Sequence, residues 1–182
     1  GISMMLLVSI VILGGIQRIA VVASKLVPFM VALYFTTVLI IVAKYIGDVP
    51  EMLVRIVTDA FTGEAAAGGA VGAVIITGAR RAAFSNEAGI GTAPMVHGAS
   101  KNREPIREGL IAMLGPFIDT IVVCTLTALV IMLTGVWQST EADGVRLTLN
   151  AFETALPGIG KYLLMTAVLI FALSTMFTYS YY

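Results

Sequence analysis

The chain has 182 residues, of which 58% are hydrophobic and 12% charged, and its formal net charge at pH 7 is zero. Soluble domains usually carry about 25% charged residues, so this composition indicates a membrane protein. Without an excess of positive charge there is no electrostatic basis for binding nucleic acid. The single cysteine, Cys124, excludes an intramolecular disulfide and a cysteine-based metal site.

Four apolar segments are predicted to cross the membrane as helices, because about 17 to 25 mostly apolar residues span the hydrocarbon layer. They are residues 2–16, 26–43, 109–136 and 162–182, and the first is slightly short. The sequence begins and stops inside apolar runs. We therefore expect residues 1–182 to be a fragment of one all-α transmembrane domain, surrounded by membrane lipid.

A fifth crossing is predicted over residues 65–97, as a broken helix. Glycines interrupt its apolar first part, and Gly89 and Gly91 interrupt the part that follows Arg81. Backbone without helical hydrogen bonds is tolerated at membrane depth only where protein or a water-filled cavity surrounds it. Secondary transporters bind substrate and ions at such discontinuous helices. This segment therefore predicts a transporter.

Charges in the connecting segments predict the orientation of the five crossings. Basic residues lie in the loop around Arg18 and Lys25 and in the loop over residues 100–108. The positive-inside rule places both loops in the cytoplasm. The connections at 44–64 and 137–161 are then external, and they carry most of the acidic residues. An amphipathic stretch from Val145 to Leu156 is expected to form a short lid helix.

Glu87, in the run Ser85-Asn86-Glu87-Ala88-Gly89, is the sharpest candidate for a functional residue. An ionisable group inside a membrane segment is costly and marks a functional site by default. The glycines let the backbone leave the helix, which exposes N–H groups for a carboxylate and C=O groups for a cation. The alternative is an ion pair with Arg80 or Arg81 that only fastens two helices.

Asp119 is a second acidic residue inside a predicted span. Two interpretations stay open: it faces a coupling ion or proton, or it pairs with a cationic group or with free backbone N–H groups. Pro116, one turn earlier, predicts a kink that frees a carbonyl group.

Three further features of the sequence have both a functional and a purely structural interpretation. Ser174 and Thr175 carry hydroxyl oxygens that suit Na⁺, although such hydroxyls often bond to carbonyls of their own helix. Tyr179 is typical of an aromatic belt at the membrane surface. His97 is predicted to be a packing residue, because no second histidine or cysteine is spaced to form a metal site.

Two other classes of membrane protein compete with the transporter hypothesis. An ion channel also contains broken helices, but the chain shows no repeated filter residues. A membrane enzyme needs a paired nucleophile and base, and Ser85 and His97 lie too far apart on a helical segment to suggest one. We therefore expect no enzymatic activity.

Five runs of sequence, in this order along the whole chain, closely resemble the sodium-coupled alanine/glycine symporters of bacteria and archaea. They are Gly14–Ala20, Lys25–Met30, Ala83–Pro94, Phe117–Thr120, and Phe171–Thr175 with Tyr179–Tyr182. Within the third run, Phe-Ser-Asn-Glu-Ala-Gly is the specific motif. The resemblance implies transmembrane helices 4 to 8 of a LeuT-like inverted-repeat fold, with the broken span as helix 6.

The resemblance also implies a function: inward transport of small neutral amino acids, alanine and glycine, with Na⁺ across the cytoplasmic membrane of a prokaryote. Proton coupling within the same fold is the alternative. The substrate and ion site would be lined by Phe84, Ser85, Asn86, Glu87, Ala88, Gly89 and Ile90. Ser174 and Thr175 would lie near a sodium site. Tyr179 stands where the resemblance leads us to expect tryptophan, so it is a candidate for altering the substrate pocket.

Overall fold

The computed structural model describes residues 2–61, 71–87, 89–139 and 143–180, and in these ranges it contains helices and no strand. Among them, three helical segments are long and apolar enough to cross a membrane: Gln17–Lys44, Pro105–Leu133 and Gly160–Tyr179. The prediction of an all-α membrane protein is therefore confirmed. The inverted repeat of the LeuT-like fold remains a prediction.

The helices form two compact units, and the expectation of one transmembrane domain stays a prediction. The first unit comprises Gly1–Lys44 and Thr134–Tyr182, and the second comprises Tyr45–Leu133. Helices α1 (Ile2–Ile12), α2 (Gly15–Lys44), α9 (Val136–Ser139), α10 (Val145–Ala155) and α11 (Gly160–Tyr179) belong to the first. Helices α3 (Val49–Ala60), α5 (Val71–Asn86), α6 (Thr92–Gly98), α7 (Pro105–Pro116), the π-helix η1 (Phe117–Val123) and α8 (Cys124–Leu133) belong to the second.

The start of the chain differs from the predicted boundaries. Helix α1 ends at Ile12, four residues before the predicted end of the first span, and α2 begins at Gly15, whose φ of 70° allows the turn between them. Arg18 and Lys25, expected in a loop, lie within α2. A charged side chain does not interrupt the backbone hydrogen bonds of a helix, so α2 continues through the residues that we expected to form a loop.

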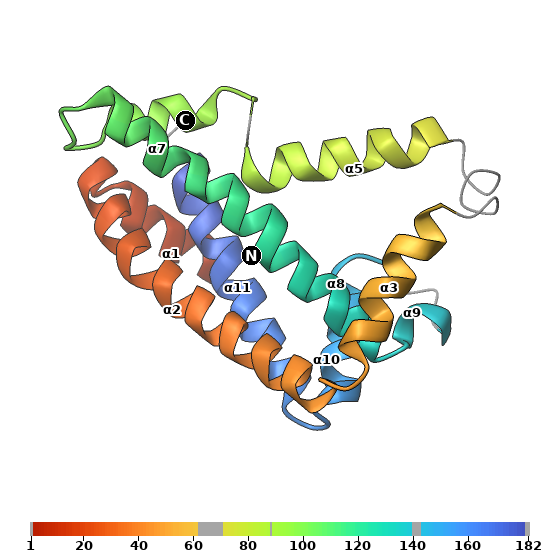
Figure 1. Cartoon of the computed structure of the whole chain (residues 1–182). Coiled ribbons are helices and arrows are strands. Elements are labelled where there is room, and N and C mark those ends of the chain that lie inside the picture. Colours follow the sequence, from red (N-terminus) through yellow and green to blue (C-terminus); the bar gives the residue numbers. More distant parts are fainter. Residues whose placement is uncertain (1, 62–70, 88, 140–142, 181–182) are drawn as a thin grey trace. The chain divides into compact units, whose positions relative to one another are not determined.

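In the first unit, α11 packs along α2, and α1 lies beside α2 (Figure 1). Each of these two long helices buries a few apolar side chains, although much of its surface is exposed or half-buried. Examples are Val38 and Ile41 on α2, and Leu164 and Ala167 on α11.

The predicted amphipathic stretch forms α10, which packs against α11. Phe152 is fully buried, and its ring stacks on Tyr34 of α2 with 6.0 Å between centroids. The Lys44 ammonium donates to the Ala155 carbonyl oxygen at 2.8 Å, which satisfies the end of α10. Glu153 accepts the backbone N–H groups of Gly158 and Lys161, and these bonds lower the pKa of its carboxyl group. A role for α10 as a lid remains a prediction.

In the second unit, α7, η1 and α8 follow one another as a continuous helical segment (Figure 1). The π-helix begins directly after Pro116, which has no N–H to donate. At its end the N–H of Cys124 bonds to the Asp119 carbonyl, five residues earlier. Pro116 thus coincides with a change in helix type rather than with a simple kink.

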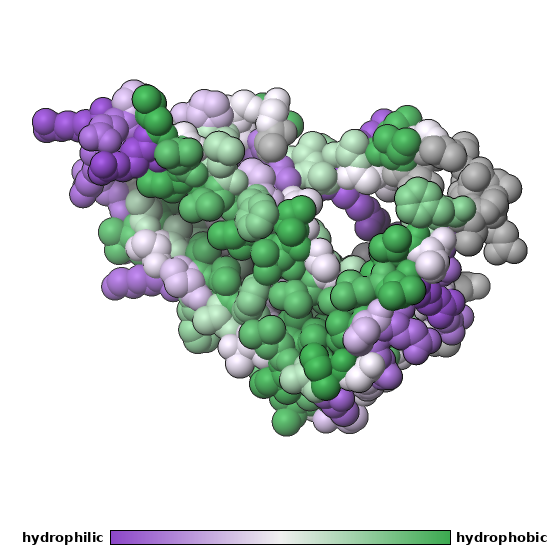
Figure 2. Space-filling model, in the orientation of Figure 1, coloured by the Kyte–Doolittle hydropathy of each residue, from purple (hydrophilic) through white to green (hydrophobic). Residues whose placement is uncertain are grey.

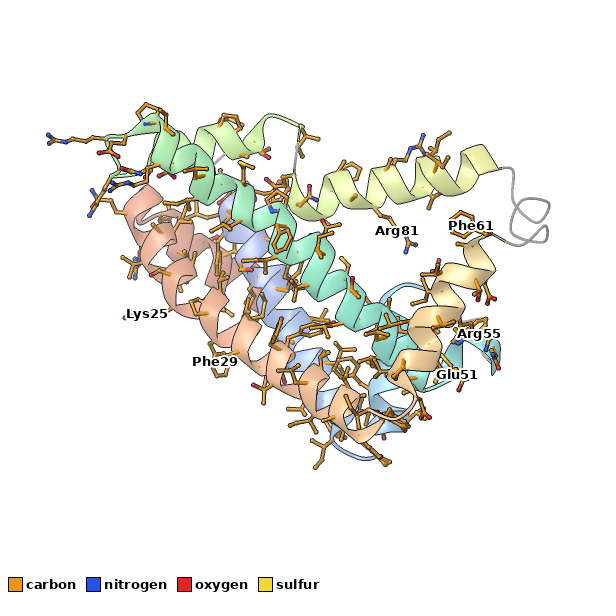
Figure 3. All side chains as sticks on the ribbon, in the orientation of Figure 1. Lys25, Phe29, Glu51, Arg55, Phe61 and Arg81 are labelled. Atoms are coloured by element: carbon orange, nitrogen blue, oxygen red, sulfur yellow. The ribbon has the colours of Figure 1, made fainter. Side chains whose placement is uncertain are left out.

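Helix α3 packs against α8 and was not predicted. It is strongly amphipathic and begins with Pro50 in its first turn. Arg55 and Asp59 pair across one turn at 3.2 Å, and Figure 3 shows Arg55 and Glu51 on this helix. We predicted this segment to be a connection because α3 is too short to span a membrane and carries several charged residues.

Apolar side chains cover much of the surface, as expected of helices that contact lipid or further helices (Figure 2). Hydrophilic residues gather at the connection between α6 and α7, at the upper left of Figure 2. This is the loop that the charge pattern predicts to be cytoplasmic.

Candidate functional site

The predicted break lies between α5 and α6, where α5 ends at Asn86 and α6 begins at Thr92 (Figure 1). Gly89 and Gly91 have φ angles of 83° and 93°, and Glu87 has a φ of 57°. The left-handed region is natural for glycine but costs free energy for a glutamate. Such strain at a non-glycine residue is typical of functional sites.

The end of α5 is held to the π-helix by two hydrogen bonds between side chains. The Ser85 hydroxyl donates to Asp119 Oδ2 at 2.6 Å, and the Asn86 amide donates to Thr120 Oγ1 at 2.9 Å. Each pair joins residues that lie 34 positions apart in the sequence. The structure therefore brings Asp119, which the sequence left open between two roles, to the predicted substrate segment.

Thr120 is a member of this site that our sequence reasoning did not single out. It follows Asp119 in the run that carries the family resemblance, and it lies within η1. A π-helix inside a longer helix is often found at functional sites. Pro116 was the signal that the backbone departs from regular α-helix here.

The Glu87 carboxylate bridges the break. Thr92 Oγ1, at the first residue of α6, donates to Glu87 Oε2 at 2.5 Å. Glu87 is half-buried. A carboxylate that accepts a hydroxyl group at this distance forms a charge-assisted hydrogen bond. The arginines offered as alternative partners, Arg80 and Arg81, lie on α5, and an ion pair with Glu87 remains the alternative prediction.

The remaining residues of the predicted site segment flank the break. The side chains of Phe84 and Ile90 are 74% and 46% exposed, so both remain accessible for apolar contacts. Ala88 lies outside the described residues. The segment thus presents an anionic group, hydroxyl and amide groups, and two apolar side chains around a turn of non-helical backbone.

The proposed sodium ligands lie in the other unit, on α11. Ser174 is buried, and its hydroxyl donates to the Phe171 carbonyl at 2.9 Å. The Thr175 carbonyl accepts the hydroxyl of Thr178 at 3.1 Å. A hydroxyl that donates its hydrogen can still accept through its oxygen lone pairs, and the sodium-binding role of Ser174 and Thr175 stays a prediction. Tyr179, the last residue of α11, is 43% exposed.

His97 has a charged partner that the sequence did not predict. Its Nδ1 lies 2.6 Å from Glu108 Oε1, and the second carboxylate oxygen accepts the Ser100 hydroxyl at 2.9 Å. Its partner lies eleven residues away on another helix, which no local spacing rule would have found. Among the described residues, no group of three histidine, cysteine or acidic residues could hold a metal ion.

Comparison with known proteins places the whole chain in one family. The sodium:alanine symporter family matches residues 1–182. An uncharacterized transporter of Haemophilus influenzae is 44% identical over 97% of this chain and 40% of its own length. The sodium/alanine symporter AgcS of Methanococcus maripaludis is 39% identical over 94% of this chain and 38% of its own length.

A third relative, the putative sodium/proton-dependent alanine carrier protein YrbD of Bacillus subtilis, is 34% identical over 100% of this chain and 40% of its own length. The chain thus spans about two fifths of the curated relatives that it matches. No solved structure matches it. On the strength of the match over all of its residues, the chain belongs to the sodium:alanine symporter family, which is a family of transporters and not of enzymes.

Proposed function

We propose that the full-length protein couples the entry of Na⁺ to the uptake of small neutral amino acids, alanine and glycine, across the cytoplasmic membrane. The observation that carries this proposal is the broken helix, in which Glu87 bridges to Thr92 while Ser85 and Asn86 are held by η1. Broken helices provide free backbone groups for zwitterionic substrates and ions in secondary transporters.

The substrate site in this proposal is the segment from Phe84 to Ile90. Backbone N–H groups freed at the break suit the carboxylate of an amino acid, and freed carbonyl oxygens or the Glu87 carboxylate suit its ammonium group. The exposed side chains of Phe84 and Ile90 provide apolar surface for a small side chain. Tyr179 is proposed to limit the size of that side chain.

Sodium in this proposal binds to oxygen ligands that include the hydroxyls of Ser174 and Thr175, and Asp119 takes part in ion coupling. The chemistry fits, because hydroxyl and carboxylate oxygens are hard ligands suited to a hard cation. Two hydroxyl groups do not complete a coordination shell, so further ligands must come from backbone carbonyls or other helices. Proton coupling is the second candidate, since Glu87 and Asp119 are acidic residues at the break and one relative is named as sodium/proton-dependent.

The test is uptake of labelled alanine by the purified full-length protein in proteoliposomes. We expect an inward Na⁺ gradient to drive accumulation and a K⁺ gradient of the same size to drive none. Accumulation driven by a pH gradient alone would replace Na⁺ coupling by proton coupling. Equilibration without accumulation under any gradient would contradict symport and favour a channel.

A further inference from the structure

Helix α6 is seven residues long, and among the described residues neither α6 nor α7 buries a side chain. Apolar packing therefore does little to hold α6 in place within its unit. A pocket of about 450 Å³, lined in part by Pro94, His97 and Ala112, lies alongside the two helices. Within the described part of this unit, the side-chain hydrogen bonds that involve α6 lie at its two ends.

Both ends of α6 make such contacts. At the first residue, Thr92 holds the Glu87 carboxylate across the break. In the last turn, His97 pairs with Glu108 on α7 at 2.6 Å. The exposed fractions of the two side chains are 33% and 18%, so water screens this pair less than it screens a surface ion pair.

The connection between α6 and α7 is folded around the same carboxylate. Ser100 donates its hydroxyl to Glu108 and accepts the N–H of Asn102, whose side chain in turn accepts the N–H of Glu104. This chain of bonds leads directly to the N-terminus of α7 at Pro105. Glu108 therefore joins the end of α6, the connecting loop and the first turn of α7.

We propose that the His97–Glu108 pair is a latch that positions α6, and through Thr92 positions the Glu87 carboxylate at the substrate site. The proposal rests on the proposed function of the break. His97 is a positioning residue here, because it acts on Glu87 only through the seven residues of α6. Losing a hydrogen bond to a charged group should therefore be measurable as about a tenfold change in the opening equilibrium of α6.

The first measurement follows hydrogen exchange in the purified full-length protein, and it requires no transport. His97→Phe removes the polar contact while retaining an aromatic ring. We expect exchange of the amides of residues 96–100, which are hydrogen-bonded within and just after α6, to accelerate by about tenfold or more, while α11 is unchanged. His97→Gln retains an N–H donor and should restore most of the protection.

The matched control is Arg107→Gln. Arg107 pairs with Glu104 at 3.2 Å in the same region, but both side chains are about two-thirds exposed. This exposed pair should contribute little, so the control should leave exchange of α6 within about twofold of the parent protein. Unchanged exchange in His97→Phe, or an equal effect of Arg107→Gln, would overturn the latch.

The second measurement is alanine uptake by the same variants. A loosened α6 should raise the KM for alanine about tenfold in His97→Phe and less in His97→Gln, with a smaller change in kcat. In a double variant with Glu108→Gln the loss should be smaller than the sum of the two single losses, because both substitutions remove the same His97–Glu108 contact. Additive losses would contradict the pairing. Absence of alanine uptake by the parent protein would overturn the proposed function, whereas hydrogen exchange would still decide the latch.

Discussion

Ser85 on α5 and Ser24 on α2 use the same hydroxyl group in different ways. Ser24 donates to the Val21 carbonyl of its own helix at 2.9 Å, and Thr37, Thr127 and Thr166 likewise bond back to carbonyls four residues earlier. Ser85 donates instead to Asp119 on a separate helical segment, and Thr92 donates across the break to Glu87. These four hydroxyls are thus satisfied by carbonyls of the same helical segment, whereas Ser85 and Thr92 at the break donate to other elements.

This difference separates hydroxyl groups that connect two elements of the structure from hydroxyl groups that only satisfy their own donor. Back-bonding is the common state of serine and threonine inside membrane helices and has little cost or specificity. A hydroxyl committed to a carboxylate on another element fixes the relative position of both. Substitutions should therefore affect transport strongly at the break and weakly in the continuous helices.

The largest effect is expected for Glu87→Gln, which removes the charge that bridges α5 and α6. Alanine uptake should fall by about a hundredfold, near the upper limit for loss of a charged hydrogen bond, while membrane insertion is retained. Glu51→Gln on the exposed face of α3 is the matched control and should leave uptake within about twofold. Normal uptake and Na⁺ affinity in Glu87→Gln would remove Glu87 from the proposed site.

Ser85→Ala tests the comparison most directly, since Ser24→Ala makes the same change at a hydroxyl that bonds to its own helix. We expect alanine uptake to fall about tenfold in Ser85→Ala, because Asp119 loses a charged hydrogen bond. Ser24→Ala should stay within about twofold of the parent protein. Equal effects of the two substitutions on initial uptake rates would show that the contact with Asp119 has no special role.

Tyr179→Trp tests whether the end of α11 belongs to the substrate pocket. A larger ring should exclude larger side chains, and one methylene in an apolar pocket is worth roughly 1–3 kcal/mol. The ratio of alanine to aminobutyrate uptake in competition assays should therefore rise about tenfold. Tyr162→Trp, at the other end of α11, should leave the ratio unchanged. An identical ranking of competitors in all three proteins would return Tyr179 to the role of an interfacial anchor.

Thr175→Val is expected to have the smallest effect and to act on the ion. It removes one oxygen ligand with little change in volume, so the Na⁺ concentration for half-maximal uptake should rise about threefold to tenfold. The affinity for alanine at saturating Na⁺ should change less. Thr166→Val on the same helix is the control, because its hydroxyl bonds to the Tyr162 carbonyl. If both variants keep the parent Na⁺ dependence, Thr175 serves only helix packing.

Apolar content and glycine spacing predicted much of the architecture. Three segments that satisfied the length requirement became long helices, and the glycines after Glu87 marked the place where α5 stops. These features depend on local chemistry, because a lipid-exposed backbone must satisfy its own hydrogen bonds and glycine relaxes the limit on φ. Charge was a poorer guide to boundaries, since Arg18 and Lys25 lie inside α2.

The hydrogen-bond partners of the candidate site residues were decided by tertiary structure. Ser85 meets Asp119 and Asn86 meets Thr120 because the π-helix after Pro116 presents these two residues to the end of α5. In a π-helix each backbone N–H bonds to the carbonyl five residues earlier instead of four, which changes the direction of the side chains around the helix axis. A regular α-helical periodicity in the sequence therefore could not predict which residues face α5. The contact between His97 and Glu108 also depends on tertiary structure. It forms because the loop between α6 and α7 brings the two helices together, and the Ser100 hydroxyl in that loop donates to Glu108 as well.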